Sequence, residues 1–159
     1  MTLAVGVQEQ ERSSHRTIPL PHEYEVSVGW EPDGSGVVTA GSRPVILGGP
    51  PPQFGGRAEL WSPEHLLLSA LSLCLMSTFQ VFLSRQPYCV IHCSSRVKGV
   101  LEKTAAGIAF SRIVIDVDVE AAAHRIEDVK RLLETAKRHC IVANALKTPV
   151  ELRISAKAA

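Results

Sequence analysis

The sequence predicts an α+β domain, and three observations carry that prediction. Apolar and polar residues alternate with a two-residue period near both ends of the chain, which indicates strands with one buried face. Between them, residues 66–82 form an uncharged, largely apolar run of helical length. The chain shows no β-α-β alternation and no Gly-rich phosphate loop, so a doubly wound nucleotide-binding fold is not expected.

The N-terminal half is expected to contain short strands followed by a loop. Residues 23–30 alternate between apolar and polar side chains, and Pro32-Asp33-Gly34 supplies the residues of a turn. Segments 36–40 and 44–47 read as two further strands. The next segment, 48–56, is too rich in Gly and Pro to be regular structure and leads the chain to the helix.

The central helix has a clear start signal. Ser62 can accept hydrogen bonds from the unpaired N–H groups, and Pro63 and Glu64 suit the first helical turn. The helix is expected to reach about Arg85, ahead of a proline. It is almost long enough to span a bilayer, but serine, threonine and glutamine interrupt it and strand patterns flank it. The sequence therefore favours a helix buried in protein, and no membrane partner is expected.

The C-terminal half is expected to hold a long hairpin, two helical segments and a last strand. A five-residue loop separates two long strand patterns, and the amphipathic segment that follows keeps its charges on one side. The expected elements are strands 88–101 and 108–120, helix 126–138, a helical turn at 140–146 and a strand around 150–154.

Composition limits the classes of protein and partner. The length of 159 residues and 45% hydrophobic content suit a single domain, with residues 1–20 as a flexible tail and 21–159 as the domain. A formal net charge of +1 gives no basic field for a nucleic acid. Four cysteines are too few for a disulfide scaffold, so a reducing, cytoplasmic location is expected.

The cysteines and histidines do not have the spacing of a metal site, and no cofactor is expected. The chain has no C-x-x-C pair and no helical His pair, and it also lacks the G-x-S-x-G elbow of a Ser hydrolase. Cys89 and Cys93 stand four positions apart on a strand, about 13 Å, which is beyond disulfide reach, so we interpret them as packing residues. Taken alone, Cys74 would be an ordinary core residue and Glu64 an ordinary helix stabiliser.

Two stretches together carry a resemblance to a known family. The first, SPEHLLLSALSLC, runs from Ser62 to Cys74, and the second, CIVANAL, runs from Cys140 to Leu146. They resemble the OsmC/Ohr family of osmotically induced and organic hydroperoxide resistance proteins, over about residue 22 to the end. The resemblance implies an OsmC-like fold, in which antiparallel strands pack around a long buried central helix, and an intertwined homodimer.

The resemblance also implies an activity. It suggests a thiol-dependent peroxidase that reduces organic hydroperoxides, with Cys74 as the peroxidatic cysteine, Cys140 as the resolving cysteine, and a dithiol reductant, lipoyl-type or other, that restores both. Such chemistry needs a thiolate to attack the peroxide and a second thiol to trap the sulfenic acid. The start of a helical turn and the flanking Arg138 and His139 are expected to favour ionisation of Cys140.

The family pattern gives Glu64 the task of orienting an arginine at the thiolate. Family members carry that arginine in the first hairpin turn, here Pro32-Asp33-Gly34, or just before the Phe of the loop, here Gln53. Arg57 is therefore the best available cation, with Arg43 as the other substitute. Glu64 and Cys74 are ten positions apart, about 15 Å along a straight helix. We therefore expect two chains to pair through their central helices, so that each site uses residues of both.

The substrate pocket is expected to be apolar, with walls from the central helix: Trp61, Leu66, Leu67, Leu71, Leu75, Phe79 and Phe82. An apolar wall suits an alkyl or fatty acyl peroxide. Two alternatives remain at this stage. One is a protein of the same fold that binds a small molecule with weak or no peroxidase activity, and the other is a redox sensor that acts on a protein partner.

Overall fold

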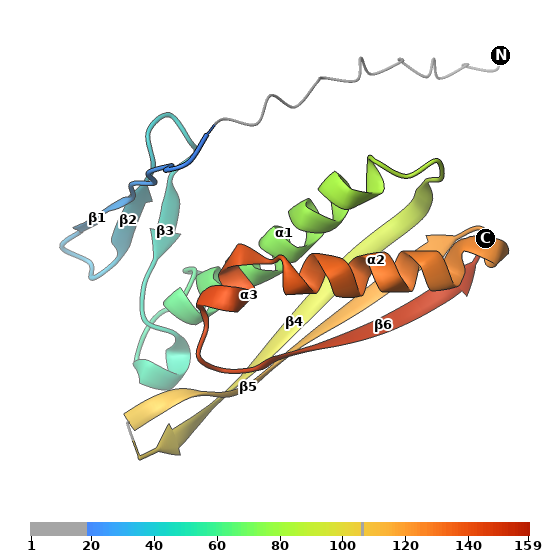
Figure 1. Cartoon of the computed structure of the whole chain (residues 1–159). Helices are drawn as coiled ribbons and strands as arrows, with labels where there is room; N and C mark the ends of the chain where they lie inside the picture. The colour runs from blue at the N-terminus through green and yellow to red at the C-terminus, as the bar shows by residue number, and fades with distance from the viewer. Residues whose placement is uncertain (1–18, 106) are drawn as a thin grey trace, which may run out of the picture.

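The computed structural model describes residues 19–105 and 107–159, so most of the expected N-terminal tail lies outside the described residues. The described chain forms two separate three-stranded sheets and a layer of helices (Figure 1). In chain order the elements are β1 (Ser27–Trp30), β2 (Gly36–Thr39), β3 (Ile46–Gly48), the 3₁₀ turn η1 (Pro52–Phe54), α1 (Pro63–Leu83), β4 (Val90–Thr104), β5 (Gly107–Ala121), the 3₁₀ turn η2 (Ala123–Arg125), α2 (Ile126–Arg138), α3 (Ile141–Ala145) and β6 (Val150–Ala158).

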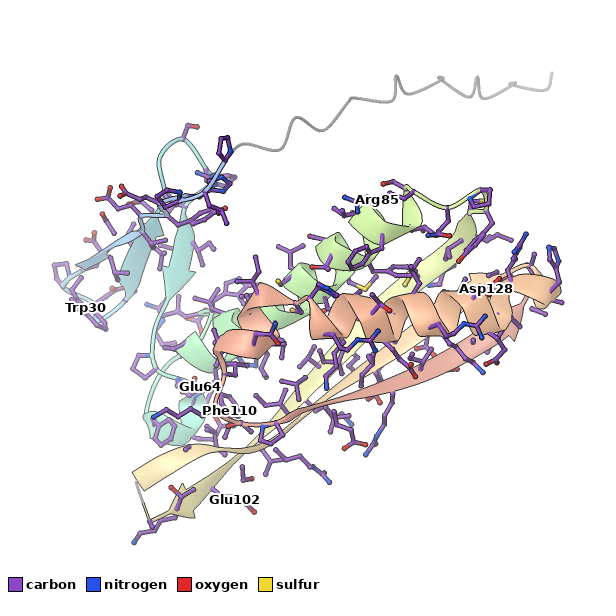
Figure 2. The ribbon with its side chains drawn as sticks, in the orientation of Figure 1. Trp30, Glu64, Arg85, Glu102, Phe110 and Asp128 are labelled. Carbon is purple, nitrogen blue, oxygen red and sulfur yellow. The ribbon has the colours of Figure 1, made fainter. Side chains whose placement is uncertain are left out.

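The small sheet, β1-β2-β3, is antiparallel and stands apart from the rest of the fold (Figure 1). Cross-strand pairs such as Val28 with Val38 place apolar side chains on the same face. Trp30 on that sheet is 71% exposed (Figure 2). At the β3 end, the amide of Trp61 donates to the carbonyl of Leu47. The small sheet therefore leaves large apolar side chains exposed in the single chain.

The large sheet has the order β4-β5-β6, and α1 and α2 lie across one of its faces (Figure 1). The long hairpin β4-β5 is antiparallel, as the sequence predicts, but β6 pairs parallel with β5. The chain crosses over the sheet through α2 and α3 before it enters β6, which makes one β-α-β connection. The predicted α+β class is confirmed, and the parallel pairing of the last strand was not predicted.

The core lies between α1, α2 and the inner face of the large sheet. Leu71, Leu75 and Phe79 recur every fourth residue on α1 and are fully buried against it. Val129 and Leu133 do the same from α2, as its predicted amphipathic pattern requires. The β5 residues of the core, all at most 3% exposed, are Ile113, Ile115, Val117 and Val119. One stripe of α1 is thus the centre of the core.

The other side of α1 is open in the single chain. Leu73, on the opposite side of the helix from the buried stripe, is 69% exposed, and Val81 is 40% exposed. By length and composition α1 could cross a membrane, and among the described helices it alone meets that test. In this fold the helix packs one face into the protein core, as the sequence analysis expects for a core helix.

Candidate functional site

Cys74 lies in the middle of α1, at the border between the buried face and the open face of the helix. Ser62 fixes the start of the helix: its hydroxyl accepts the amide of His65 at 3.2 Å, and Ser62 itself is buried. The helix then carries Cys74 to a half-buried position against the core. Thr78 donates a hydrogen bond to the Cys74 carbonyl at 2.8 Å. The thiol is therefore presented from a rigid element.

Cys140 is the residue that precedes α3, and its side chain is fully buried. Its thiol lies close enough to the Cys74 thiol for the two side chains to interact, and both cysteines are free. The fold brings them together because α3 packs against α1. Two thiols about 66 positions apart in the chain thus adjoin, as a disulfide between them would require.

The environment of Cys140 contradicts the predicted ionisation. Burial raises the pKa of the Cys140 thiol above its ordinary value, and the neighbouring Cys74 raises it further, while the amides of Ala143 and Val142 pull it down. The flanking side chains are engaged elsewhere. The His139 ring contacts the carbonyl of Thr135, and Arg138 donates to the Thr135 hydroxyl. The predicted ionisation is wrong because Cys140 is buried, which raises its pKa, and because the side chains of Arg138 and His139 bond to Thr135.

Glu64 lies in the first turn of α1, far from Cys74 of its own chain. Ten residues of helix separate them, about 15 Å along the axis. One carboxylate oxygen, Oε2, is buried and has no hydrogen-bond partner among the described residues. A buried acceptor without a donor is costly, so this oxygen needs a partner that the described chain does not supply.

Arg57 lies on the loop before α1 and is held by two carboxylates. It bonds Asp33 in the β1-β2 turn at 2.8 Å and Glu59 at 2.7 Å. Hydrogen bonds from Ser35, and to a smaller extent from Arg57, lower the pKa of Asp33. The hydrogen bonds that Arg57 donates to Glu59 and Asp33 raise the pKa of Arg57. Within one chain, therefore, Glu64 does not orient Arg57. Arg43, the other substitute, bonds its own turn at the Ala40 carbonyl.

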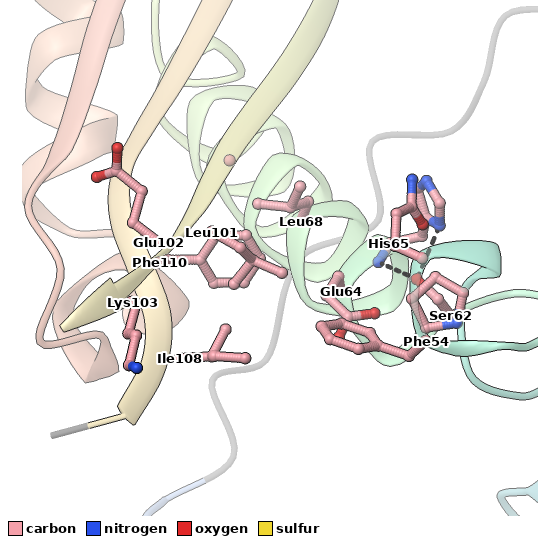
Figure 3. A pocket seen from close by; sticks show the side chains of 13 residues that line it. Phe54, Ser62, Glu64, His65, Leu68, Leu101, Glu102, Lys103, Ile108 and Phe110 are labelled. Carbon is pink, nitrogen blue, oxygen red and sulfur yellow. Dashed lines mark hydrogen bonds between the residues drawn. The ribbon is translucent and has the colours of Figure 1, made fainter.

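Two cavities open beside the start of α1, and Glu64 borders both. The first, of about 530 Å³, lies between η1, the first turns of α1 and the β4-β5 hairpin (Figure 3). The second, of about 500 Å³, lies between the small sheet and α1 and is lined by Val28, Trp30, Val38, Phe54, Trp61 and Leu66. Both have mainly apolar walls.

Some of the side chains predicted as pocket walls border a cavity, and others lie in the core. Trp61 and Leu66 line the second cavity. Leu71, Leu75 and Phe79 are core residues instead, because they belong to the buried stripe of α1. The hairpin residues around the first cavity, such as Phe110, were not anticipated. Cys89 is exposed rather than packed, whereas Cys93 is half-buried against the core.

The OsmC-like protein family matches residues 56–155, which is more than half of the chain and includes both Cys74 and Cys140. The chain belongs to the OsmC-like family. No curated protein matches the chain.

Solved structures agree on the fold of this OsmC-like protein. An OsmC-like protein of unknown function from Vibrio cholerae superposes with a TM-score of 0.77 at 20% identity, over 85% of this chain and 100% of the other. An organic hydroperoxide resistance protein from Elizabethkingia anophelis gives 0.69 at 15% identity, over 88% and 100%. One from Bacillus subtilis gives 0.63 at 15%, over 86% and 98%. At such identities the likeness concerns the fold.

Among the described residues, no three His, Cys, Asp or Glu side chains gather as a metal ion would need. The chemistry that this arrangement offers is that of its thiols. The half-buried Cys74 thiol adjoins the fully buried Cys140 thiol at the middle of α1. Apolar cavities, bordered by the Glu64 oxygen that has no partner among the described residues, lie at the start of the same helix.

Proposed function

We propose that this OsmC-like protein is a thiol-dependent peroxidase of organic hydroperoxides. The observation that carries the proposal is the contact between Cys74 and Cys140 across the fold. The Cys74 thiolate attacks the terminal oxygen of the hydroperoxide, so an S–O bond forms as the O–O bond breaks. The departing alkoxide takes a proton from solvent and leaves as the alcohol. The Cys74 sulfenic acid then condenses with the Cys140 thiol, which releases water and forms a disulfide. A dithiol, lipoyl-type or other, reduces that disulfide.

The two thiols have environments that fit these different roles. Cys140 is fully buried and its raised pKa keeps it neutral, so it is a poor first nucleophile. It is well placed to meet a sulfenic acid that forms on the more accessible Cys74. Free thiols in this arrangement suit a reducing compartment such as the cytoplasm.

We infer that the working form is a homodimer in which the α1 helices pair through their open faces. The open stripe of α1 around Leu73 and the exposed small sheet supply apolar surface for such a contact. In an antiparallel pair that crosses near exposed Ser69, Glu64 of each chain reaches the level of the partner's Cys74. The expected interface buries on the order of 2,000 Å² or more. Sedimentation at low micromolar concentration tests this, since a stable monomer would remove the catalytic role of Glu64.

Arg57 is the proposed cation of the site. Asp33 and Glu59 hold its guanidinium on the loop that leads into α1, and dimerisation would bring that loop towards the partner's helix. A guanidinium near Cys74 favours the thiolate over the thiol. In this proposal Glu64 of the partner chain, rather than Glu64 of the same chain, orients Arg57.

A second candidate is a small-molecule-binding or redox-sensing protein with weak or no peroxidase activity. The observation that favours it is the state of the arginines. The first hairpin turn carries Asp33, the position before Phe54 is Gln53, and Arg57 already satisfies two carboxylates. A site without a cation at the thiolate would react slowly with peroxide.

Turnover of cumene hydroperoxide with a dithiol reductant separates the two candidates. The peroxidase proposal predicts catalytic consumption by the wild type and none by Cys74→Ser. Cys140→Ser should complete one turnover and then stop, with Cys74 overoxidised. Cys89→Ser serves as the control, because it removes an exposed thiol away from the pair. Wild-type protein that consumes no peroxide in excess of its own thiols would support the binding protein instead.

A further inference from the structure

The cavity between η1, α1 and the β4-β5 hairpin has the properties of a small-molecule pocket. Its volume of about 530 Å³ lies in the usual range for ligand sites. Residues of three separate elements line it, so it is a hollow between elements rather than one uncovered face (Figure 3). Its apolar lining consists of Pro51, Phe54, Leu68, Leu101, Ile108 and Phe110.

Phe110 limits this cavity because Gly99 allows its ring to lie against the strand. A Cβ on Gly99 would meet Phe110 Cε1 at 2.4 Å and the Leu68 side chain at 3.2 Å. The β4-β5 register explains the position of the ring. Val100 pairs with Arg112 and Leu101 with Phe110, so β5 carries an extra residue at this point. That bulge turns Phe110 towards α1, on the side where Ile113 also enters the core.

The polar part of the cavity is concentrated at Glu64. Its buried Oε2 has no donor among the described residues, and Figure 3 shows the carboxylate beside Phe54 and across from Ile108. The other charged or titratable groups in the lining are His65, Glu102 and Lys103. Glu102 points away from the centre of the cavity (Figure 3). An occupant should therefore have an apolar body and a head that donates a hydrogen bond, as the O–OH group of a hydroperoxide does.

We propose that this cavity binds the alkyl part of the hydroperoxide and that Phe110, seated on Gly99, sets the longest chain that fits. The inference rests on the proposed function and on the shared site of the dimer, since Cys74 of the same chain lies elsewhere on α1. Each methylene that enters an apolar pocket improves binding by about four-fold. The gain should stop at the length where the chain meets the Phe110 ring.

Two substitutions with opposite effects test the pocket. Phe110→Ala removes the ring and should extend the preferred chain. Gly99→Ala pushes the ring into the cavity and should shorten it. Ile91→Ala is the control, because Ile91 is 64% exposed on β4 and does not line the cavity. The readout is kcat/KM for primary alkyl hydroperoxides from butyl to dodecyl, with circular dichroism to show that each variant is folded.

A second measurement does not depend on turnover. Unreactive primary alkanols of the same lengths are titrated into the Cys74→Ser protein and into its Phe110→Ala and Gly99→Ala double variants. We expect affinity to rise about four-fold per methylene up to a limit, with the limit longer in the Phe110→Ala background and shorter in the Gly99→Ala background.

The two assays distinguish failure of the pocket from failure of the peroxidase proposal. If hydroperoxides are consumed but the chain-length profile is the same in all variants, the pocket inference is wrong and the peroxidase stands. If no hydroperoxide is consumed but the alkanol limit shifts with Phe110 and Gly99, the pocket stands and the peroxidase proposal fails. Alkanols that bind with no length limit, or do not bind, overturn the pocket.

Discussion

Oxidation of Cys74 and Cys140 to a disulfide should stabilise the fold by an amount set by the number of residues between the two cysteines. A disulfide between them closes a loop of about 66 residues. The loop-closure entropy removed from the unfolded chain then corresponds to roughly 4 kcal/mol. Strain is expected to be small because the two side chains already meet in the reduced fold. Urea lowers the stability of small proteins by about 1–3 kcal/mol per molar, so the midpoint should rise by on the order of 2 M.

Urea unfolding of reduced and peroxide-treated protein, at one fixed protein concentration, measures this shift. Cys140→Ser protein given the same treatment is the control, because it cannot form the disulfide and should keep its midpoint. A disulfide between Cys74 and Cys140 with an unchanged or lower midpoint would refute the reasoning, since it would mean that the fold must distort to bring the sulfurs together.

Three other outcomes are expected. In native protein, maleimide should label exposed Cys89 within the first time points and buried Cys140 last. Labelling of Cys140 should rise only at a pH above the ordinary thiol pKa, because burial raises the pKa of Cys140. Equal labelling rates for the two cysteines would contradict the burial. Leu73→Asp should give monomers in sedimentation and lose at least ten-fold in peroxide turnover, whereas dimers with full activity would exclude pairing through that face. Arg57→Ala should slow hydroperoxide turnover more than Arg43→Ala, and equal rates would remove Arg57 from the site.

Much of the fold was predictable from local patterns. The Ser62-Pro63-Glu64 start, the alternation of β5 and the amphipathic pattern of α2 each reflect burial on one face, and that burial is present. The parallel pairing of β6 was not predictable, because alternation reveals a buried face but not the direction of the neighbouring strand. The end of α1 at Leu83 falls two residues before the predicted one, since helix ends fray.

The cysteines of the site were predictable because they lie in the motifs of the family pattern. The cavity residues were not, because their positions depend on the tertiary structure. The two sequence motifs, 62–74 and 140–146, contain Cys74 and Cys140, and the fold brings the two thiols next to each other. The role of Phe110 depends on a one-residue bulge in a long hairpin, which leaves no clear signal in the sequence. Gly99 in the middle of a strand is the one available signal, because glycine there often marks a close approach of another group.

The central claim is that organic hydroperoxide oxidises Cys74 and that Cys140 traps the product. The most direct measurement treats fully reduced protein with one equivalent of cumene hydroperoxide, counts the remaining thiols and maps disulfides by peptide mass spectrometry. The account predicts that two of the four thiols disappear, that one equivalent of alcohol is released, and that the Cys74–Cys140 peptide pair is the product. Loss of Cys89 or Cys93 thiols with Cys74 left reduced would contradict it.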